Sequence, residues 1–262
     1  MKKRIEWIDC VRAVGMVLII IGHTYAVGFW QNLVYAINVP IFFVLSGYLT
    51  HRKTIRQTAL GGVRTLLVPY GVTALLIFFL SLVSLHRHVP GMITTANWNH
   101  FLIAALYGIG TPSSQTIFHG TVIPAIGAIW FLLAMYFGNI IYQLLLNATH
   151  ALSRGKETAV LVGASLILAV GAFMVSAVIQ LPWSLGPALL SISFYTAGHI
   201  IREYRMMDLN MRNGILALAG LLLCCWSAVR GQFWFNTGYA TDPLLKMLGA
   251  MAGSYFLMYL FK

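Results

Sequence analysis

Residues 7–23 read WIDCVRAVGMVLIIIGH, an apolar stretch that carries three ionisable side chains, Asp9, Arg12 and His23. The apolar run continues to Phe29 and is long enough to cross a hydrocarbon core of about 30 Å as a helix. Ionisable side chains are costly where they face lipid, so we expect these three to face protein or a water-filled cavity. The stretch therefore predicts a first transmembrane helix with a polar site on one face.

The rest of the chain is equally apolar, since 59% of its 262 residues are hydrophobic and only 9% are charged. This composition excludes a water-soluble domain. Eight runs approach spanning length, at about 8–29, 33–50, 61–85, 122–146, 158–180, 183–201, 213–229 and 243–261. They predict an all-α, polytopic transmembrane helix bundle. No polar segment could build a second core, so we expect one membrane domain over residues 1–262.

The basic residues are distributed as the positive-inside rule requires. A cytoplasmic N-terminus places thirteen of them inside, namely Lys2, Lys3, Arg4, Arg52, Lys53, Arg56, Arg64, Arg154, Lys156, Arg202, Arg205, Arg212 and Lys262. The outer side keeps only Arg87, Arg230 and Lys246. We expect a multi-pass protein of the bacterial inner membrane with both termini cytoplasmic. The net charge of +11 reports this topology, and no nucleic-acid partner is expected.

The segment from His86 to Thr121 interrupts the series of spans. Its apolar part, Phe101–Gly110, is too short to cross a bilayer, so we expect a re-entrant or interfacial outer segment. Four histidines lie here, His86, His88, His100 and His119, without the Cys or acidic residues that would complete a metal site. We expect no metal. His119 either contacts an acceptor near the outer mouth or is a solvated loop side chain.

Arg12 and His23 are eleven residues apart, which returns to nearly the same helix face roughly 16 Å along the axis. Arg12 is suited to holding a phosphate near the cytoplasmic end, and His23 is suited to taking a proton from a hydroxyl. Asp9 is placed to orient Arg12. The alternative is structural: Arg12 reaches the interface, Asp9 assists the helix start, and His23 bonds a neighbouring helix.

Several short motifs follow one another along the chain. Trp7–Arg12 is followed by His23, and residues 39–49 read VPIFFVLSGYL. These resemble the Arg-x10-His signature and the Pro-x-Phe-Phe-x-x-Ser-Gly-Tyr/Phe stretch of the acyltransferase-3 family. Three further elements follow in order: Arg64–Tyr70, the Ile129–Leu132 stretch of the fucose O-acetylase-like branch, and Phe194–Ile201.

The resemblance implies transfer of an acyl group, usually acetyl from acetyl-CoA, to a hydroxyl of a surface glycan or lipid-linked sugar. Arg12 and His23 match the pair regarded as essential in that family. Family members usually have about ten helices, so this chain is either a short form or lacks the last spans. The alternatives to an O-acetyltransferase are a truncated, non-catalytic acyl-CoA-binding relative and a transporter. Membrane lipid is an expected partner, and the oligomeric state stays open.

Four other positions are candidates. Arg64 either meets a phosphate of CoA beside Arg12 or anchors the third span at the interface. Ser46 lacks the setting of a nucleophile, and with Gly47 it is expected to permit close helix packing, so we place Ser46 and Tyr48 among residues lining the site. Trp130 is expected to line an acyl or sugar pocket.

Overall fold

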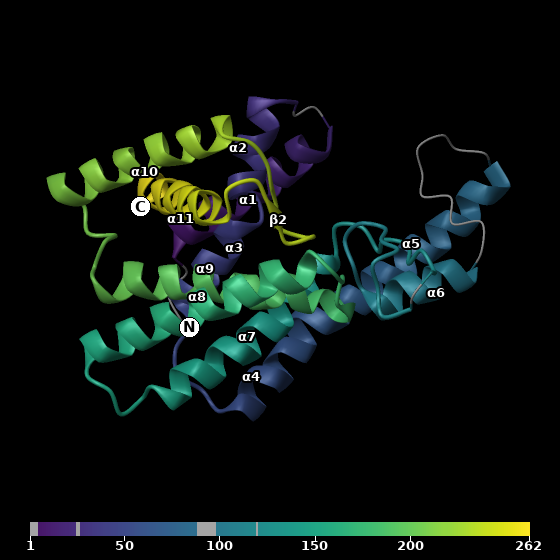
Figure 1. Cartoon of the computed structure of the whole chain (residues 1–262), viewed down its shortest axis with the longest axis horizontal. Coiled ribbons are helices and arrows are strands. Elements are labelled where there is room, and N and C mark those ends of the chain that lie inside the picture. The colour runs from purple at the N-terminus through teal and green to yellow at the C-terminus, as the bar shows by residue number, and fades with distance from the viewer. Residues whose placement is uncertain (1–4, 25–26, 88–97, 119) are drawn as a thin grey trace.

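The computed structural model describes residues 5–24, 27–87, 98–118 and 120–262, with side chains omitted for 81–99 (Figure 1). The helices are α1 (Glu6–Thr24), α2 (Phe29–Ile37), α3 (Pro40–Leu49), α4 (Ile55–Gly62), α5 (Val68–Arg87), α6 (Trp98–Tyr107), α7 (Trp130–Ala148), α8 (Arg154–Ser176), α9 (Leu185–Glu203), α10 (Met211–Val229) and α11 (Pro243–Phe261). A π-helical turn, Val63–Leu67, joins α4 to α5, and a 3-10 turn, Pro182–Ser184, precedes α9. The strands β1 (Phe233–Trp234) and β2 (Tyr239–Ala240) form an antiparallel hairpin. The fold is an all-α bundle, as predicted.

Within the described residues, seven helical segments are long and apolar enough to cross a membrane: 6–24, 29–49, 55–80, 130–148, 154–176, 211–229 and 243–261. The predicted span at 183–201 corresponds to α9, which has 19 residues. Polar side chains such as Ser191, Thr196 and His199 make α9 less apolar, but these three are buried. Because neighbouring helices surround it, α9 needs no lipid-facing apolar surface.

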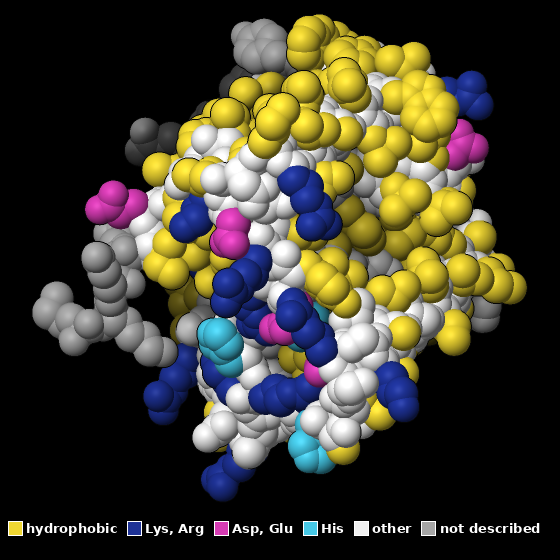
Figure 2. Space-filling model, turned by 90° about the vertical axis from the view of Figure 1, so that its left-hand side faces the viewer, with side chains coloured by type: hydrophobic (Ala, Val, Ile, Leu, Met, Phe, Trp, Pro, Cys, Tyr) yellow, Lys and Arg dark blue, Asp and Glu magenta, His cyan; other side chains and the backbone are white. Residues whose placement is uncertain are grey.

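The two termini lie at the same end of the bundle (Figure 1). The Lys262 ammonium lies 5.7 Å from the ring centroid of Trp7. Other contacts join segments distant in sequence at this end, including the ion pairs Arg52–Glu157 and Arg154–Glu203. Figure 2 shows Lys and Arg side chains gathered here beside extensive apolar surface. The bundle therefore has one basic end, as the charge pattern predicts.

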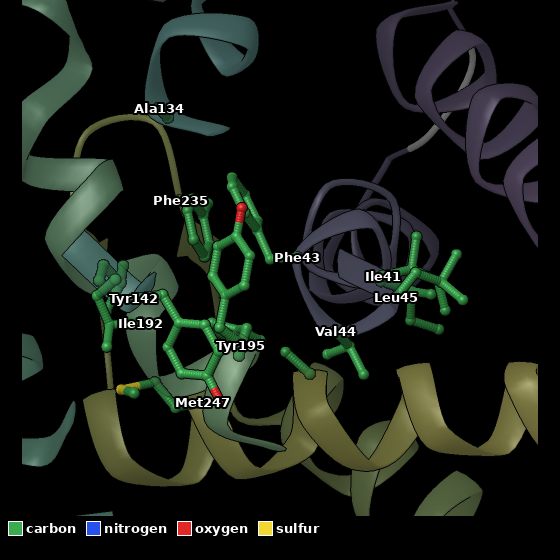
Figure 3. Packing of buried hydrophobic residues seen from close by; sticks show 14 of the residues in the cluster. Ile41, Phe43, Val44, Leu45, Ala134, Tyr142, Ile192, Tyr195, Phe235 and Met247 are labelled. Carbon is green, nitrogen blue, oxygen red and sulfur yellow. The ribbon is translucent and has the colours of Figure 1, made fainter. Parts of the chain in front are cut away.

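The helices α3 and α9 cross with their backbones in contact. A Cβ atom on Gly47 would collide with the carbonyl oxygen of Tyr195, and one on Gly198 would collide with that of Val44. Aromatic rings fill the space beside the crossing: Phe43 stacks on Phe235 with centroids 5.1 Å apart (Figure 3). The small residues of two separate sequence motifs thus make one helix interface.

Small residues also bring α10 and α11 together, and a buried lysine joins the end of α10 to the beginning of α11. A Cβ atom on Gly249 would lie 2.5 Å from Cβ of Ser227. Lys246 is 1% exposed, and its Nζ donates to the backbone carbonyls of Ser227 and Gly231. These carbonyls lie at the C-terminal end of α10, where a positive charge is favourable. Lys246 was predicted on the outer side, and it lies at the end opposite the termini.

The short helix α6 packs against α5. Phe101 is buried with its ring centroid 5.2 Å from that of Phe78, and the Tyr70 hydroxyl donates to the carbonyl of Ala105 at 2.7 Å. Beyond α6, the Ser184 hydroxyl donates to the carbonyl of Gly108. At 10 residues, α6 is too short to span a bilayer, in agreement with the prediction for this segment.

The predicted span at 122–146 was wrong at its beginning. The helix begins at Trp130, and residues 122–129 form a loop. Gly127 has a φ of 80°, a conformation outside the right-handed helix, and Pro124 lacks the N–H that a helix interior needs. Apolar composition alone concealed this loop, which forms part of the cavity described below.

We predict that Gly198→Ala lowers the free energy of unfolding by about 3 kcal/mol, because an added methyl group must push α3 and α9 apart. The matched control is Gly171→Ala in α8, where a Cβ atom would meet nothing within 4 Å. Thermal unfolding of the purified variants in detergent measures the difference. Equal melting temperatures for the two variants would contradict the proposed interface.

Candidate functional site

The helix α1 presents Arg12 and His23 to two cavities at different levels of the bundle. Arg12 lines a cavity of about 340 Å³ near the basic end, here called the basic cavity. His23 lines a cavity of about 320 Å³ toward the opposite end, here called the histidine cavity. The eleven-residue spacing separates the two Cα atoms by roughly 16 Å along the helix.

The basic cavity lies among α1, α3, α4 and α7. Its cationic side chains are Arg12 and Lys53, with His51 beside them. Asp9 forms an ion pair with Arg12 at 3.6 Å across one turn of α1, and the Arg12 side chain remains 52% exposed. The backbone of Lys53 is held by the side-chain amide of Asn147, which donates to its carbonyl at 3.0 Å. Such a cavity suits an anionic group.

Several aromatic rings line the histidine cavity. The Tyr35 ring stacks on Trp234 with centroids 5.8 Å apart, and Trp130 stacks on Phe235 at 6.3 Å. His23 meets Tyr35 edge-on at 6.3 Å. All five of these residues line the cavity, and two of them, Trp234 and Phe235, belong to the β-hairpin. Aromatic faces of this kind pack against apolar surfaces of acyl groups and sugars.

The rings of Phe42 and Phe131 pack against each other, with centroids 6.3 Å apart. Along α3, Phe42 occupies the face between Val39, which lines the histidine cavity, and Ser46, which lines the basic cavity. Gly15 makes room for the Phe42 ring, because a Cβ atom there would lie 2.9 Å from its Cζ. A molecule reaching from one cavity to the other would pass this aromatic pair.

The hydrogen bond of His23 fixes which ring nitrogen can act as a base. Nδ1 lies 2.8 Å from the backbone carbonyl oxygen of Ile19. Because a carbonyl only accepts, Nδ1 carries the proton in the neutral ring, and Nε2 is left with a free lone pair. The side chain is exposed, so Nε2 can accept a proton from a ligand.

Apart from Asp9, which pairs with Arg12, each predicted site residue lines the basic cavity, lines the histidine cavity, lines neither, or lies outside the described residues. Arg12 and Ser46 line the basic cavity, and His23 and Trp130 line the histidine cavity. Arg64 is exposed beside Thr65, and Tyr48 packs its ring on Trp7 at 5.6 Å; neither side chain is among those lining these cavities. His119 lies outside the described residues.

A family model described as an acyltransferase domain, that of the acyltransferase-3 family, matches residues 5–262. The chain belongs to this family. No curated protein and no solved structure matches the chain. The matched residues include those that line both cavities and the β-hairpin between α10 and α11. The protein is therefore a multi-pass membrane member of an acyltransferase family.

Sequence reasoning missed several cavity residues. Tyr35 lies in the last turn of α2 and Asn38 lies in the break between α2 and α3, which apolar composition did not reveal. Trp234 and Phe235 belong to the run QFWFN at 232–236, outside every predicted span. This aromatic cluster in a loop between two predicted spans was the available signal, since a loop exposes large aromatic residues chiefly where they bind or pack.

The C-terminal end of α3, which forms part of the basic cavity, depends on Arg202. Its guanidinium donates to the backbone carbonyls of Tyr48 and Thr50. We predict that Arg202→Met lowers the free energy of unfolding by about 2 kcal/mol, because charge-assisted bonds to carbonyls at a helix end are lost. The matched control is Arg212→Met, an exposed arginine at the same end. Equal loss of thermal stability in both variants would contradict this role.

Proposed function

We propose that this protein is an O-acyltransferase that moves an acetyl or similar acyl group from acyl-CoA to a hydroxyl of a surface glycan or lipid-linked sugar. The observation that carries the proposal is the placement of Arg12 and His23 on one helix but in separate cavities. This arrangement suits a reaction between a phosphorylated donor and a second substrate that approaches from the opposite end.

The basic cavity is the proposed site for the donor. CoA carries several phosphate groups, and Arg12 and Lys53 provide permanent positive charges at the cavity wall. Acyl-CoA is a cytoplasmic metabolite, and Lys and Arg concentrate on the cytoplasmic side of membrane proteins. We therefore assign the basic end to the cytoplasm and the protein to the bacterial inner membrane. The pantetheine arm would extend past Phe42 and Phe131 toward His23.

His23 is the proposed general base. Nε2 removes the proton of the acceptor hydroxyl as the hydroxyl oxygen attacks the thioester carbonyl. The tetrahedral intermediate then collapses: the carbon–sulfur bond breaks, the proton on Nε2 passes to the departing sulfur, and O-acyl sugar and CoA are formed. Ser46 lies in the other cavity from His23, which favours direct transfer over an acyl-serine intermediate.

Asn38 is the proposed donor to the carbonyl oxygen of the acyl group. It is 1% exposed and lines the histidine cavity, and its Oδ1 accepts the Val39 N–H at 2.7 Å. Its Nδ2 has no hydrogen-bond partner among the described residues and lies against Gly22, the neighbour of His23. A buried donor without an acceptor costs about 1–3 kcal/mol, and the oxyanion of the reaction would supply that acceptor.

We predict that His23→Ala lowers kcat by about 10²–10⁴-fold with little change in KM for acetyl-CoA, because the base is lost and the phosphate site is kept. Arg12→Ala should chiefly raise KM for acetyl-CoA. The measurement is CoA release from acetyl-CoA with bacterial glycan extracts, using protein in nanodiscs.

The control is His150→Ala, which removes an exposed histidine at the basic end. Undiminished turnover in His23→Ala would exclude it as the base. Absence of acyl transfer by the wild type, with acetyl-CoA binding retained, would instead support a non-catalytic acyl-CoA-binding protein.

We predict that Asn38→Leu lowers kcat by about 10²-fold while KM for both substrates stays within twofold, because only the oxyanion loses a donor. The loss of thermal stability should be small, about 1 kcal/mol, since Nδ2 has no described partner to lose and the substitution removes only the bond that Oδ1 accepts from the Val39 N–H. Steady-state kinetics and thermal unfolding are measured on the same preparation. Full kcat combined with a lower melting temperature would make Asn38 a purely structural residue.

A further inference from the structure

A third cavity, of about 460 Å³, lies beside the histidine cavity at the end opposite the termini. It is formed by the loop after α6, the C-terminal end of α8, the β-hairpin and the beginning of α11. Its volume is within the usual range for small-molecule sites, about 300–1,000 Å³. The reaction proposed above does not use it, and we call it the outer cavity.

The wall of the outer cavity combines apolar surface, such as that of Phe173, with polar groups that carry no charge. Hydroxyl and amide groups line it, including those of Thr111, Gln115 and Thr237, and none of the described residues that line it is Asp, Glu, Lys, Arg or His. The Tyr239 ring adds a half-exposed aromatic surface. The basic cavity, by contrast, contains Arg12 and Lys53. The two ends of the molecule therefore favour ligands of different charge.

The outer cavity continues the histidine cavity. Thr111 lines both, and two chain segments run from one to the other. Residues 110–111 line the histidine cavity, and residues 111–113 and 115 line the outer cavity; likewise, residues 234–236 line the first and 237–240 the second. A ligand with one end beside His23 can therefore extend into the outer cavity along the same walls.

Gln180 holds these walls together. Its side-chain Nε2 donates to the carbonyl of Thr237 at 2.9 Å and to that of Ser176 at 3.2 Å, and its backbone N–H donates to the carbonyl of Gln115 at 2.6 Å. The loop, the end of α8 and the hairpin are thus joined through one residue. A cavity preorganised in this way loses little conformational entropy when it binds a ligand.

We propose that the outer cavity binds the neutral sugar residue next to the one that is acylated, so that the acceptor is an uncharged oligosaccharide. This inference rests on the proposed function and specifies its acceptor. Sugar hydroxyls pair with the hydroxyl and amide groups of the wall, and the apolar face of a sugar ring packs on Tyr239. An acceptor with a carboxylate or phosphate at that position would find no cation among the described residues of the cavity wall.

The test compares Tyr239→Ala with wild type on neutral oligosaccharides and on the matching monosaccharides. We expect KM for the oligosaccharide to rise about tenfold, which corresponds to about 1.4 kcal/mol, with no change for the monosaccharide. The control is Trp30→Ala, an exposed aromatic residue outside the cavity. Wild type should prefer the neutral oligosaccharide over one that carries a sialic acid or phosphate.

A binding measurement without acyl-CoA separates this proposal from the proposed function. Calorimetry with the neutral oligosaccharide should show binding to wild type and weaker binding to Tyr239→Ala. If binding occurs and acyl transfer does not, the proposed function fails and the oligosaccharide site stands. If monosaccharides are acylated as well as oligosaccharides, or if Tyr239→Ala affects both equally, the outer cavity is not an acceptor site.

Discussion

The backbone contact between α3 and α9 is the constraint on which the rest of the bundle depends. Lipid provides no hydrophobic force between helices, so close packing of small residues must supply the attraction. Gly47 and Gly198 allow each helix to reach the carbonyl groups of the other. The contact holds α3 against α9, and the face of α3 that points elsewhere carries Val39, which lines the histidine cavity, and Ser46, which lines the basic cavity.

The bundle separates two kinds of chemistry along its long direction. Arg12 and Lys53 make one end suitable for phosphate, whereas no described residue that lines the outer cavity is charged. Lys246 also lies toward that end, but its ammonium donates to the carbonyls of Ser227 and Gly231 and is not among the groups that line the cavity. Under the proposed function, a phosphorylated donor and an uncharged acceptor would be kept apart until they meet beside His23.

The first helix was the most predictable part of the candidate site. The spacing of Arg12 and His23 predicts a shared helix face, and Asp9 pairs with Arg12 as expected from helix periodicity. Asn38 could not be predicted, because its unpartnered Nδ2 arises only when α2 and α3 fold against α1. Arg64 and Tyr48 matched the same motifs but line neither cavity, since a motif specifies residue order and not side-chain direction.

The sequence by itself determined the membrane-helix class, the approximate spans, the basic end and the family, because lipid requires apolar runs and topology requires an uneven charge distribution. It also placed Arg12 and His23 on one face, since helix geometry is local. Only the tertiary structure decided that α9 is buried and that Trp234 and Phe235 line the histidine cavity. It also decided that the basic, histidine and outer cavities lie at different levels of the bundle. Those features depend on contacts between segments far apart in the chain, which no local pattern encodes.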